Sequence, residues 1–228
     1  MNKMVYGIAT RYWQGWLDCV NSWLGTASEN HPYIVAPNME VLRAFQCIYE
    51  GTTEPIIAQI HDDVVIHEPG WDQRVLREFD DPTVGLVGFA GGRGHFLPQA
   101  YQQPFHIPNM IRRDFTSNLR DAEKHGKRVT GECDVAVLDG LALFIRRNVL
   151  DKWGGWPSGK PVSYFLYSEH LCCETRRQGY RIRLVGVDCE HLGGKSSGTP
   201  LPYSYEEEHR YLWDNNRDVL PYYVKETR

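Results

Sequence analysis

The sequence lacks the long apolar run of a membrane-spanning helix, and its N-terminal residues lack the apolar segment and cleavage site of a secretory leader. Its net charge of -4 gives no general electrostatic reason to bind nucleic acid or an anionic membrane. Six cysteines are present, but their spacing shows no metal-ligand pairs. We therefore expect a cytoplasmic protein with reduced thiols, no disulfide framework and no integral membrane association.

Common catalytic motifs are also missing. The GxGxxG, Walker, GxSxG and HExxH patterns do not occur where their chemistry would need them. The glycines of residues 91–94 have no lysine and no helix behind them, so they do not match a phosphate-binding loop. What is present is ordinary globular composition, with 42% hydrophobic and 24% charged residues over 228 positions. That length is most simply one domain with a large core.

Strands and helices alternate through the first 90 residues. Short apolar runs predict strands at residues 5–9, 33–36, 56–60 and 84–89, and helical spacing predicts helices at 13–24, 39–49 and 71–79. This alternation predicts an α/β fold in which helices cover both faces of a mostly parallel central sheet. Ligands of such sheets bind beyond the carboxyl ends of the strands, where Thr10, Arg11 and Asn38 would lie.

Two adjacent carboxylates follow the third predicted strand. Asp62 and Asp63 come directly after residues 56–60, and apolar residues resume behind them. Ionised carboxylates at the mouth of a buried strand are costly unless a cation compensates them, and Mg²⁺ and Mn²⁺ prefer such oxygen ligands. The alternative is an ordinary strand-to-turn junction, where Asp bonds its own backbone. Because three predicted loops converge on one sheet edge, the sequence favours a metal site for a phosphate-bearing substrate.

The pattern becomes irregular between residues 91 and 133, where we expect a long functional or mobile loop. Its second half contains six basic residues, Arg112, Arg113, Arg120, Lys124, Lys127 and Arg128. This local excess would contact a phosphate-bearing substrate or form a solvated helix face.

Regular elements return after residue 133. Residues 134–138 and 141–145 predict two strands or one bent strand, and Gly140 between them would let the backbone approach a neighbour closely. Helices are predicted at residues 146–153, in the latter part of 164–178 and at 205–215, with a strand at 181–187.

Several separated segments resemble, in order, glycosyltransferase family 2 and its GT-A fold. The run Ile56–Ile60 followed by His61-Asp62-Asp63-Val64 resembles the strand and acidic metal motif of the branch that reads His-x-Asp-Val. Later matching segments are Leu138-Asp139-Gly140, Gly154-Gly155-Trp156, Tyr167-Ser168-Glu169-His170, and Cys189-Glu190-His191 with Ser196-Ser197-Gly198. The resemblance implies one GT-A domain, with a nucleotide-sugar half at residues 1–90, an acceptor half at 91–198 and a C-terminal helix and tail at 199–228.

The resemblance also implies a reaction. It is the metal-dependent, inverting transfer of a sugar from a nucleotide-sugar, most simply a UDP-sugar, to an acceptor hydroxyl. Asp63, with His191 as a further ligand, would hold the Mn²⁺ or Mg²⁺ that offsets the charge of the departing diphosphate. Asp62 would hold the metal through water or contact the donor. The other donor contacts would be Thr10, Arg11, Asn38 and Lys195.

The acceptor side departs from the family pattern. The family's acidic pair would fall near Tyr167 and Ser168, where no carboxylate stands. Glu169, one position along, is our candidate for the base that takes the hydroxyl proton, and His170 is the other. Asp139 would help to orient the acceptor. We expect a glycan or lipid-linked sugar as acceptor, with a modified nucleic-acid base as the alternative that the basic stretch suggests.

Each candidate also has a structural interpretation. Glu169 fits a helix N-terminal acid, Asp139 precedes a glycine as in ordinary turns, and His191 fits a structural histidine after a strand.

Two other functions stay open. One is a metal-dependent phosphoesterase that activates water. Its candidate residues are His61, Asp62, Asp63, His67 and His191. The other is a GT-A-like domain that has lost its base and only binds a nucleotide or glycan. The missing carboxylate at Ser168 keeps this alternative open. Hydrolysis of simple phosphoesters would support the first, and nucleotide binding without turnover the second.

Overall fold

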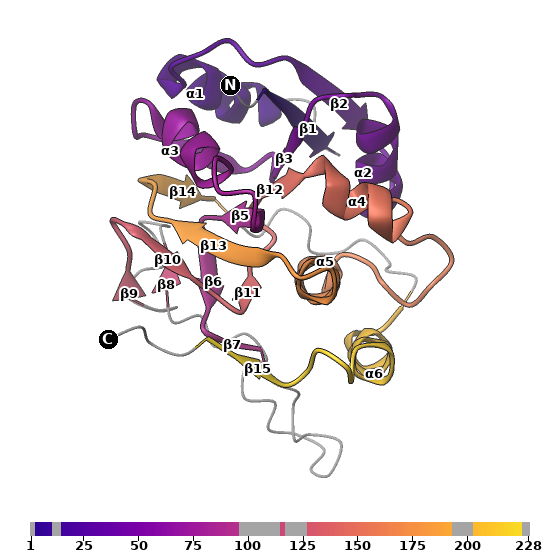
Figure 1. Ribbon diagram of the computed structural model, residues 1–228. Coiled ribbons are helices and arrows are strands. Elements are labelled where there is room, and N and C mark those ends of the chain that lie inside the picture. The colour runs from indigo at the N-terminus through magenta and orange to yellow at the C-terminus, as the bar shows by residue number, and fades with distance from the viewer. Residues whose placement is uncertain (1–2, 11–14, 96–114, 117–126, 193–202, 225–228) are drawn as a thin grey trace.

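Figure 1 shows a computed structural model of the chain, which describes residues 3–10, 15–95, 115–116, 127–192 and 203–224. A seven-stranded sheet has the strand order β10-β13-β5-β12-β3-β1-β2. The strands that run in one direction are β1 (Met4–Thr10), β2 (Tyr33–Pro37), β3 (Ile56–Ile60), β5 (Val84–Gly88) and β13 (Arg181–Val185). The strands β10 (Glu132–Asp134) and β12 (Ala142–Arg146) run the opposite way. The fold class is therefore the predicted one, α/β with a mostly parallel central sheet.

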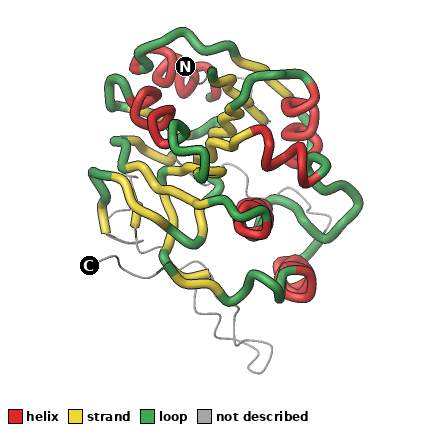
Figure 2. Tube along the Cα trace, in the orientation of Figure 1, coloured by secondary structure: helices red, strands yellow, loops and turns green. Residues whose placement is uncertain are grey.

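Side chains that alternate along the central strands build a core on each face of the sheet. Tyr6 of β1 and Ala58 of β3 belong to one core. Their neighbours Val5 and Ile57 belong to the other. The helices α1 (Trp16–Thr26) and α3 (Trp71–Glu78) cover the first face. The second face is covered by α2 (Val41–Glu50), α4 (Arg147–Trp153) and α5 (Tyr167–Arg177). Helices thus flank the sheet on both sides, as Figure 2 shows.

Three smaller sheets surround the central one. A four-stranded sheet joins β11 (Val137–Leu138), β6 (Ala90–Gly92), β8 (Phe115–Thr116) and β9 (Lys127–Arg128). Two-stranded sheets join β4 (Val64–Ile66) to β14 (Cys189–His191) and β7 (Gly94–His95) to β15 (Tyr222–Tyr223). The remaining helix, α6 (Tyr205–Asn215), packs through Leu212 against Leu166 and Cys173, on the outside of α5.

Most predicted elements are confirmed, and the differences have a common cause. The region of residues 91–133 was expected as a loop, but its described part contains short strands. The strand predicted at 134–138 is divided between β10 and β11, which belong to different sheets. The strand β14 was not predicted. Strands of two or three residues are too short for a periodic pattern, and they form here because a partner strand is adjacent.

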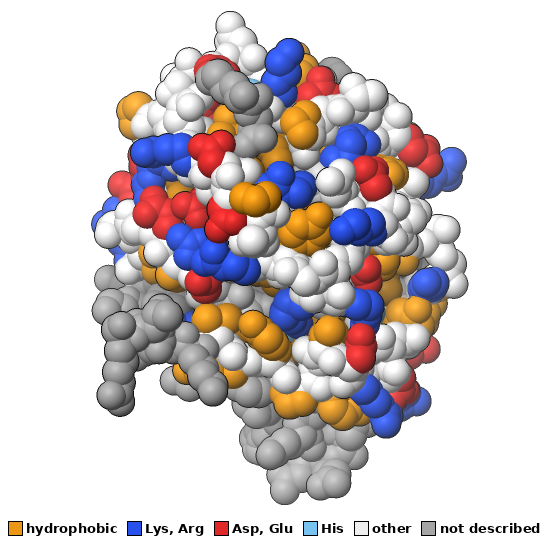
Figure 3. Space-filling model, in the orientation of Figure 1, with side chains coloured by type: hydrophobic (Ala, Val, Ile, Leu, Met, Phe, Trp, Pro, Cys, Tyr) orange, Lys and Arg blue, Asp and Glu red, His pale blue; other side chains and the backbone are white. Residues whose placement is uncertain are grey.

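All six cysteines are free, as expected. None of the described helices combines the length and the apolar content that crossing a bilayer requires. On the face drawn in Figure 3, acidic and basic side chains are interspersed rather than segregated. Arg181 forms ion pairs with Asp81, between α3 and β5, and with Asp134 of β10.

Candidate metal centre

The carboxyl ends of β3, β1 and β2 are adjacent, because these strands are parallel neighbours. Thr10 ends β1, is buried, and accepts a 2.8 Å hydrogen bond at its carbonyl from the backbone N–H of Asn38, just past β2. Asn38 has a positive φ of 55°, a conformation that Asn tolerates better than most residues. His61 follows β3 directly. The prediction that these three loops meet at one edge of the sheet is confirmed.

One strand pairing and one backbone hydrogen bond bring His191 to this edge. The chain turns after His61 into β4, and β14 pairs antiparallel with β4 so that His191 lies opposite Val64. The backbone N–H of Leu192 donates a 2.8 Å hydrogen bond to the carbonyl of Asp63. His61 and His191, which are 130 positions apart in the sequence, therefore meet at the end of β3.

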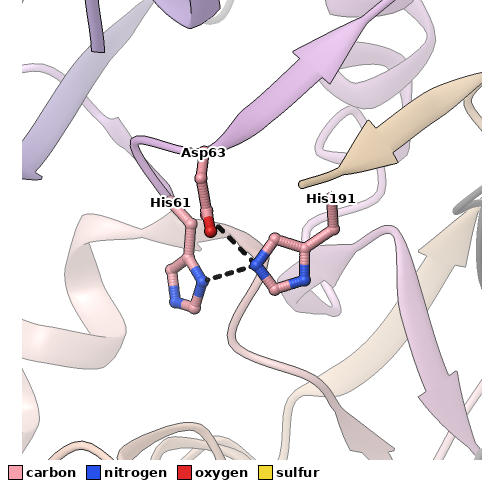
Figure 4. Close-up of side chains that lie close together, drawn as sticks. All are labelled: His61, Asp63 and His191. Atoms are coloured by element: carbon pink, nitrogen blue, oxygen red, sulfur yellow. Dashed lines mark hydrogen bonds and ion pairs between the residues drawn. The ribbon is translucent and has the colours of Figure 1, made fainter. Parts of the chain in front are cut away.

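His61, Asp63 and His191 form a compact group, shown in Figure 4. His191 Nε2 lies 3.1 Å from Asp63 Oδ1 and 3.5 Å from His61 Nδ1. All three ligand atoms lie within 4.8 Å of one another. Ligands that bind one ion at about 2.1 Å and at right angles are about 3 Å apart, so one cation fits among these atoms. Asp63 is buried and the two histidines are half-buried, so the group is both desolvated and accessible.

The surroundings keep two of the three side chains, His61 and Asp63, in protonation states that can bind a metal. Burial, and then the neighbouring His191, lower the pKa of His61 to about 4. Burial alone would raise the pKa of Asp63, but the hydrogen bond and the charge of His191 outweigh it and lower that pKa. At neutral pH, His61 is therefore a neutral imidazole and Asp63 an ionised carboxylate. Metal ions bind these forms.

The phenol of Tyr167 is a further neighbour of His61. Its oxygen lies 2.7 Å from His61 Nε2, and its hydroxyl donates a 3.0 Å hydrogen bond to the carbonyl oxygen of Gly140. A Cβ atom at Gly140 would overlap this hydroxyl, so the turn requires glycine. The expected close approach at Gly140 is thereby confirmed, and the approaching group is the Tyr167 side chain. Burial, followed by the charge of Asp139, raises the pKa of Tyr167 well above its usual range.

Asp139 lies in the turn that leads into β12. Its carboxylate accepts a 3.1 Å hydrogen bond from the backbone N–H of Leu141, the turn-stabilising role of the structural interpretation. Because the backbone N–H of His61 donates to the Leu141 carbonyl at 2.9 Å, this turn is held beside the metal group. The charge of Asp139 acts on His61 and opposes the lowering of its pKa.

The two candidate bases are neighbours in the first turn of α5. Glu169 is buried, with 2% of its surface exposed, and accepts a 2.8 Å hydrogen bond from the Ser168 hydroxyl. His170 turns toward α6, where its ring lies 5.6 Å from that of Tyr211 and its Nδ1 lies 3.5 Å from Asn216 Nδ2. His170 lines a cavity of about 170 Å³ on that side, and burial lowers its pKa to about 3. The structure thus places His170 beside α6 and not beside His61.

One member of the group was not predicted as a metal ligand of the transferase. His61 belongs to the segment that resembles the His-x-Asp-Val motif and is a candidate residue of the phosphoesterase alternative, and in the structure it completes the three-ligand group. The signal was its position two residues before Asp63 at the end of a buried strand. Asp62, between them, is half-buried. His67, the other histidine of that alternative, is not a member of the group and pairs with Glu190 at 3.1 Å.

Some predicted contacts lie outside the described residues. These are Arg11, Lys195 and the basic residues Arg112, Arg113, Arg120 and Lys124. Of the same basic stretch, the side chain of Arg128 is described, and it forms an ion pair with Asp188.

No protein-family model matches the sequence, and no curated protein matches it. Solved structures do resemble the fold. The mannosyltransferase PcManGT from Pyrobaculum calidifontis, in complex with GDP-Man and Mn²⁺, has a TM-score of 0.52 at 13% identity over 86% of this chain and 58% of its own. GalNAc-T7 with UDP, GalNAc and Mn²⁺ has a TM-score of 0.63 at 12% identity over 96% of this chain and 50% of its own.

The protein A197 from STIV has a TM-score of 0.52 at 11% identity, over 84% of this chain and 86% of its own. The chain thus spans little more than half the length of the two transferases. Identities this low show the fold alone, and that fold is GT-A-like, as in glycosyltransferases.

Proposed function

We propose that this chain is a metal-dependent, inverting glycosyltransferase that moves a sugar from a nucleotide-sugar to an acceptor hydroxyl. The observation that carries the proposal is the His61, Asp63 and His191 group at the carboxyl edge of a GT-A-like sheet. The structures of both transferase neighbours contain Mn²⁺ together with a nucleotide. In a parallel sheet, this edge is where ligands bind.

The ligand set favours Mn²⁺ over Mg²⁺. Two imidazole nitrogens and one carboxylate oxygen make a mixed site, whereas Mg²⁺ prefers oxygen ligands and bound water. A divalent ion held there would offset the charge that develops on the departing nucleoside diphosphate. We expect a UDP-sugar as donor, and GDP, which accompanies mannose in the PcManGT structure, as the alternative nucleotide.

The same edge offers donor contacts. Thr10 and Asn38 lie side by side at the ends of β1 and β2, and we propose that they contact the base and ribose of the nucleotide. Asp62 adjoins the metal group and would contact the donor or a water on the metal. We propose Arg11 and Lys195 as further contacts to the nucleotide and its diphosphate. These five contacts would orient the donor, so the transferred sugar faces the acceptor.

For the acceptor side, we propose Glu169 as the base and Asp139 as the residue that orients the hydroxyl. Glu169 is in the first turn of α5, two residues after Tyr167, which touches His61. Its carboxylate would accept the hydroxyl proton as the acceptor oxygen attacks the sugar carbon opposite the leaving diphosphate. We prefer Glu169 to His170, because a carboxylate is the residue type that the resemblance implies for the base. A glycan is the acceptor that we expect, with a modified nucleic-acid base as the alternative.

The geometry gives the phosphoesterase less support. Water activation between two metals needs a second cluster of ligands, and the part of the chain that the structure describes contains one such group. His67, which the phosphoesterase would use, pairs with Glu190 outside it.

Phosphorus NMR of the reaction products distinguishes the two functions. The protein would be incubated with UDP-sugars or GDP-sugars, Mn²⁺ and a panel of sugar acceptors. A glycosyltransferase releases intact nucleoside diphosphate, whereas a phosphoesterase releases a nucleoside monophosphate or inorganic phosphate. We expect diphosphate release that Asp63→Asn abolishes and His67→Ala leaves unchanged. Monophosphate release that depends on His67 would overturn the proposal.

A further inference from the structure

The contact between Tyr167 and His61 has a consequence for the proton on His61. A neutral imidazole has one N–H, and either ring nitrogen can carry it. The phenol of Tyr167 has one hydrogen to donate and an oxygen that also accepts. The positions of these two side chains therefore decide which nitrogen of His61 keeps a lone pair.

The backbone at Gly140 determines the direction of the hydrogen bonds. The carbonyl oxygen of Gly140 can only accept, so the Tyr167 hydroxyl uses its single hydrogen there, at 3.0 Å. The phenol oxygen can then only accept from His61, 2.7 Å away, and Nε2 must carry the hydrogen. With the hydrogen on Nδ1 instead, Nε2 and the Gly140 carbonyl would compete for one phenol hydrogen. The Nε2–H form satisfies both contacts at once.

The remaining nitrogen faces the other ligands. His61 Nδ1 lies 3.5 Å from His191 Nε2, and its lone pair is thus directed into the group formed with Asp63. Metal-ligating histidines are commonly held in this way by a second hydrogen bond on the other ring nitrogen, which fixes both tautomer and ring orientation.

Tyr167 is itself rigidly held. Its ring packs edge-on against Phe45, at a centroid distance of 5.3 Å, and against Trp156 at 6.0 Å. The absence of a side chain at Gly140 leaves room for the hydroxyl. A fixed ring places its hydroxyl at low entropic cost. Packing explains the presence of an aromatic ring here, but Phe would pack equally well, so the hydroxyl needs a separate explanation.

We propose that Tyr167 is a positioning residue that holds His61 as its Nε2–H tautomer and so presents Nδ1 as the third ligand to the metal. The tautomer assignment concerns the metal-free protein. The metal part of the inference rests on the proposed function.

The tautomer is measured without any metal. Nitrogen-15 labelling of the histidines and long-range proton–nitrogen correlation spectra distinguish a protonated from an unprotonated ring nitrogen. His61→Gln identifies the His61 signals by their loss. We expect a protonated Nε2 and an unprotonated Nδ1 in the wild type, and a mixture of both forms in Tyr167→Phe. A wild-type His61 protonated on Nδ1, or an unchanged pattern in Tyr167→Phe, would overturn the inference.

Metal affinity gives the second readout. We expect Tyr167→Phe to weaken Mn²⁺ binding about 10- to 100-fold, the usual effect of losing such a supporting hydrogen bond. Tyr6→Phe is the matched control, because Tyr6 is also a buried aromatic residue but lies in the core beside Trp23 and Trp71. It should leave Mn²⁺ affinity unchanged. Nitrogen couplings in electron spin-echo spectra of bound Mn²⁺ would show whether one imidazole is lost.

The outcomes separate the two claims. Equal Mn²⁺ affinity in the wild type and Tyr167→Phe would overturn the positioning role and leave the metal site intact. If the wild type binds no Mn²⁺, the proposed function fails and the metal part of the inference fails with it, whereas the tautomer result stands on its own spectrum.

Discussion

Position 140 requires glycine, because a Cβ atom there would overlap the Tyr167 hydroxyl. The Tyr167 hydroxyl occupies the space that a Cβ atom would need, and from there it contacts both the Gly140 carbonyl and His61. A turn residue is thereby linked to the metal group through one phenol.

Gly140→Ala tests this link at the scale of one atom. The added methyl group must displace the phenol or the turn, so we expect a loss of about 1–3 kcal/mol in the free energy of unfolding and weaker Mn²⁺ binding. Gly25→Ala is the control, because a Cβ atom at Gly25 would meet nothing within 4 Å apart from its chain neighbours and the backbone of its own helix. Urea denaturation and Mn²⁺ titration measure the two effects. Equal behaviour of the two variants would contradict the contact between Gly140 and Tyr167.

At the scale of elements, α6 supports the start of α5. The carboxylate of Glu208, in the first turn of α6, is fully buried and accepts hydrogen bonds from the Ser163 hydroxyl and, at 3.3 Å, from the backbone N–H of Leu166. Leu166 is the residue that precedes α5, so Glu208 fixes the segment that leads to Tyr167.

Glu208→Ala should therefore reduce the free energy of unfolding by about 1–3 kcal/mol, because two buried donors lose their acceptor. Glu206→Ala removes a carboxylate from the same helical turn, but Glu206 is exposed. We expect that control to change stability by less than about 0.5 kcal/mol. Chemical denaturation of both variants measures the difference, and a similar stability for both would show that α6 does not hold the start of α5.

The elements also show what the sequence could and could not predict. Long periodic segments were predictable: α6 was predicted with its observed bounds, and β3 likewise. The short strand β14 was not predictable, because three residues are too few to show a hydrophobic period. Its partner β4 also lies over 120 residues earlier in the sequence. The metal group depends on that pairing. Asp63 was predicted from its place behind a buried strand and His191 through the family resemblance, whereas the part played by Tyr167 depends on a side-chain contact that the sequence does not display.

The whole molecule contains several buried histidines outside the metal group. Burial lowers the pKa of His170 to about 3 and that of His209 to about 4. His95 accepts a 2.9 Å hydrogen bond at Nδ1 from Arg176, and burial followed by the charge of Arg176 lowers its pKa well below the usual value. In the unfolded chain, each would titrate near pH 6.5.

Stability should therefore fall as the solution is acidified below about pH 6.5, because the unfolded chain then binds protons that the folded protein does not. Each such histidine contributes up to about 1.4 kcal/mol per pH unit. His170→Gln removes one titrating group, so the slope of unfolding free energy between about pH 4 and 6 should decrease by about that amount. Urea denaturation across this pH range measures the slope. An unchanged slope of unfolding free energy against pH in His170→Gln would contradict the buried, neutral state of His170.

The central claim is that a metal held by the His61, Asp63 and His191 group binds the diphosphate of a nucleotide-sugar. Calorimetric titration of UDP and GDP, with and without Mn²⁺, tests it most directly on the wild type, Asp63→Ala and the surface control His67→Ala. We predict micromolar binding that requires Mn²⁺, persists in His67→Ala and is at least about 100-fold weaker in Asp63→Ala. Nucleotide binding that is absent, or that is indifferent to both Mn²⁺ and Asp63, would contradict the account.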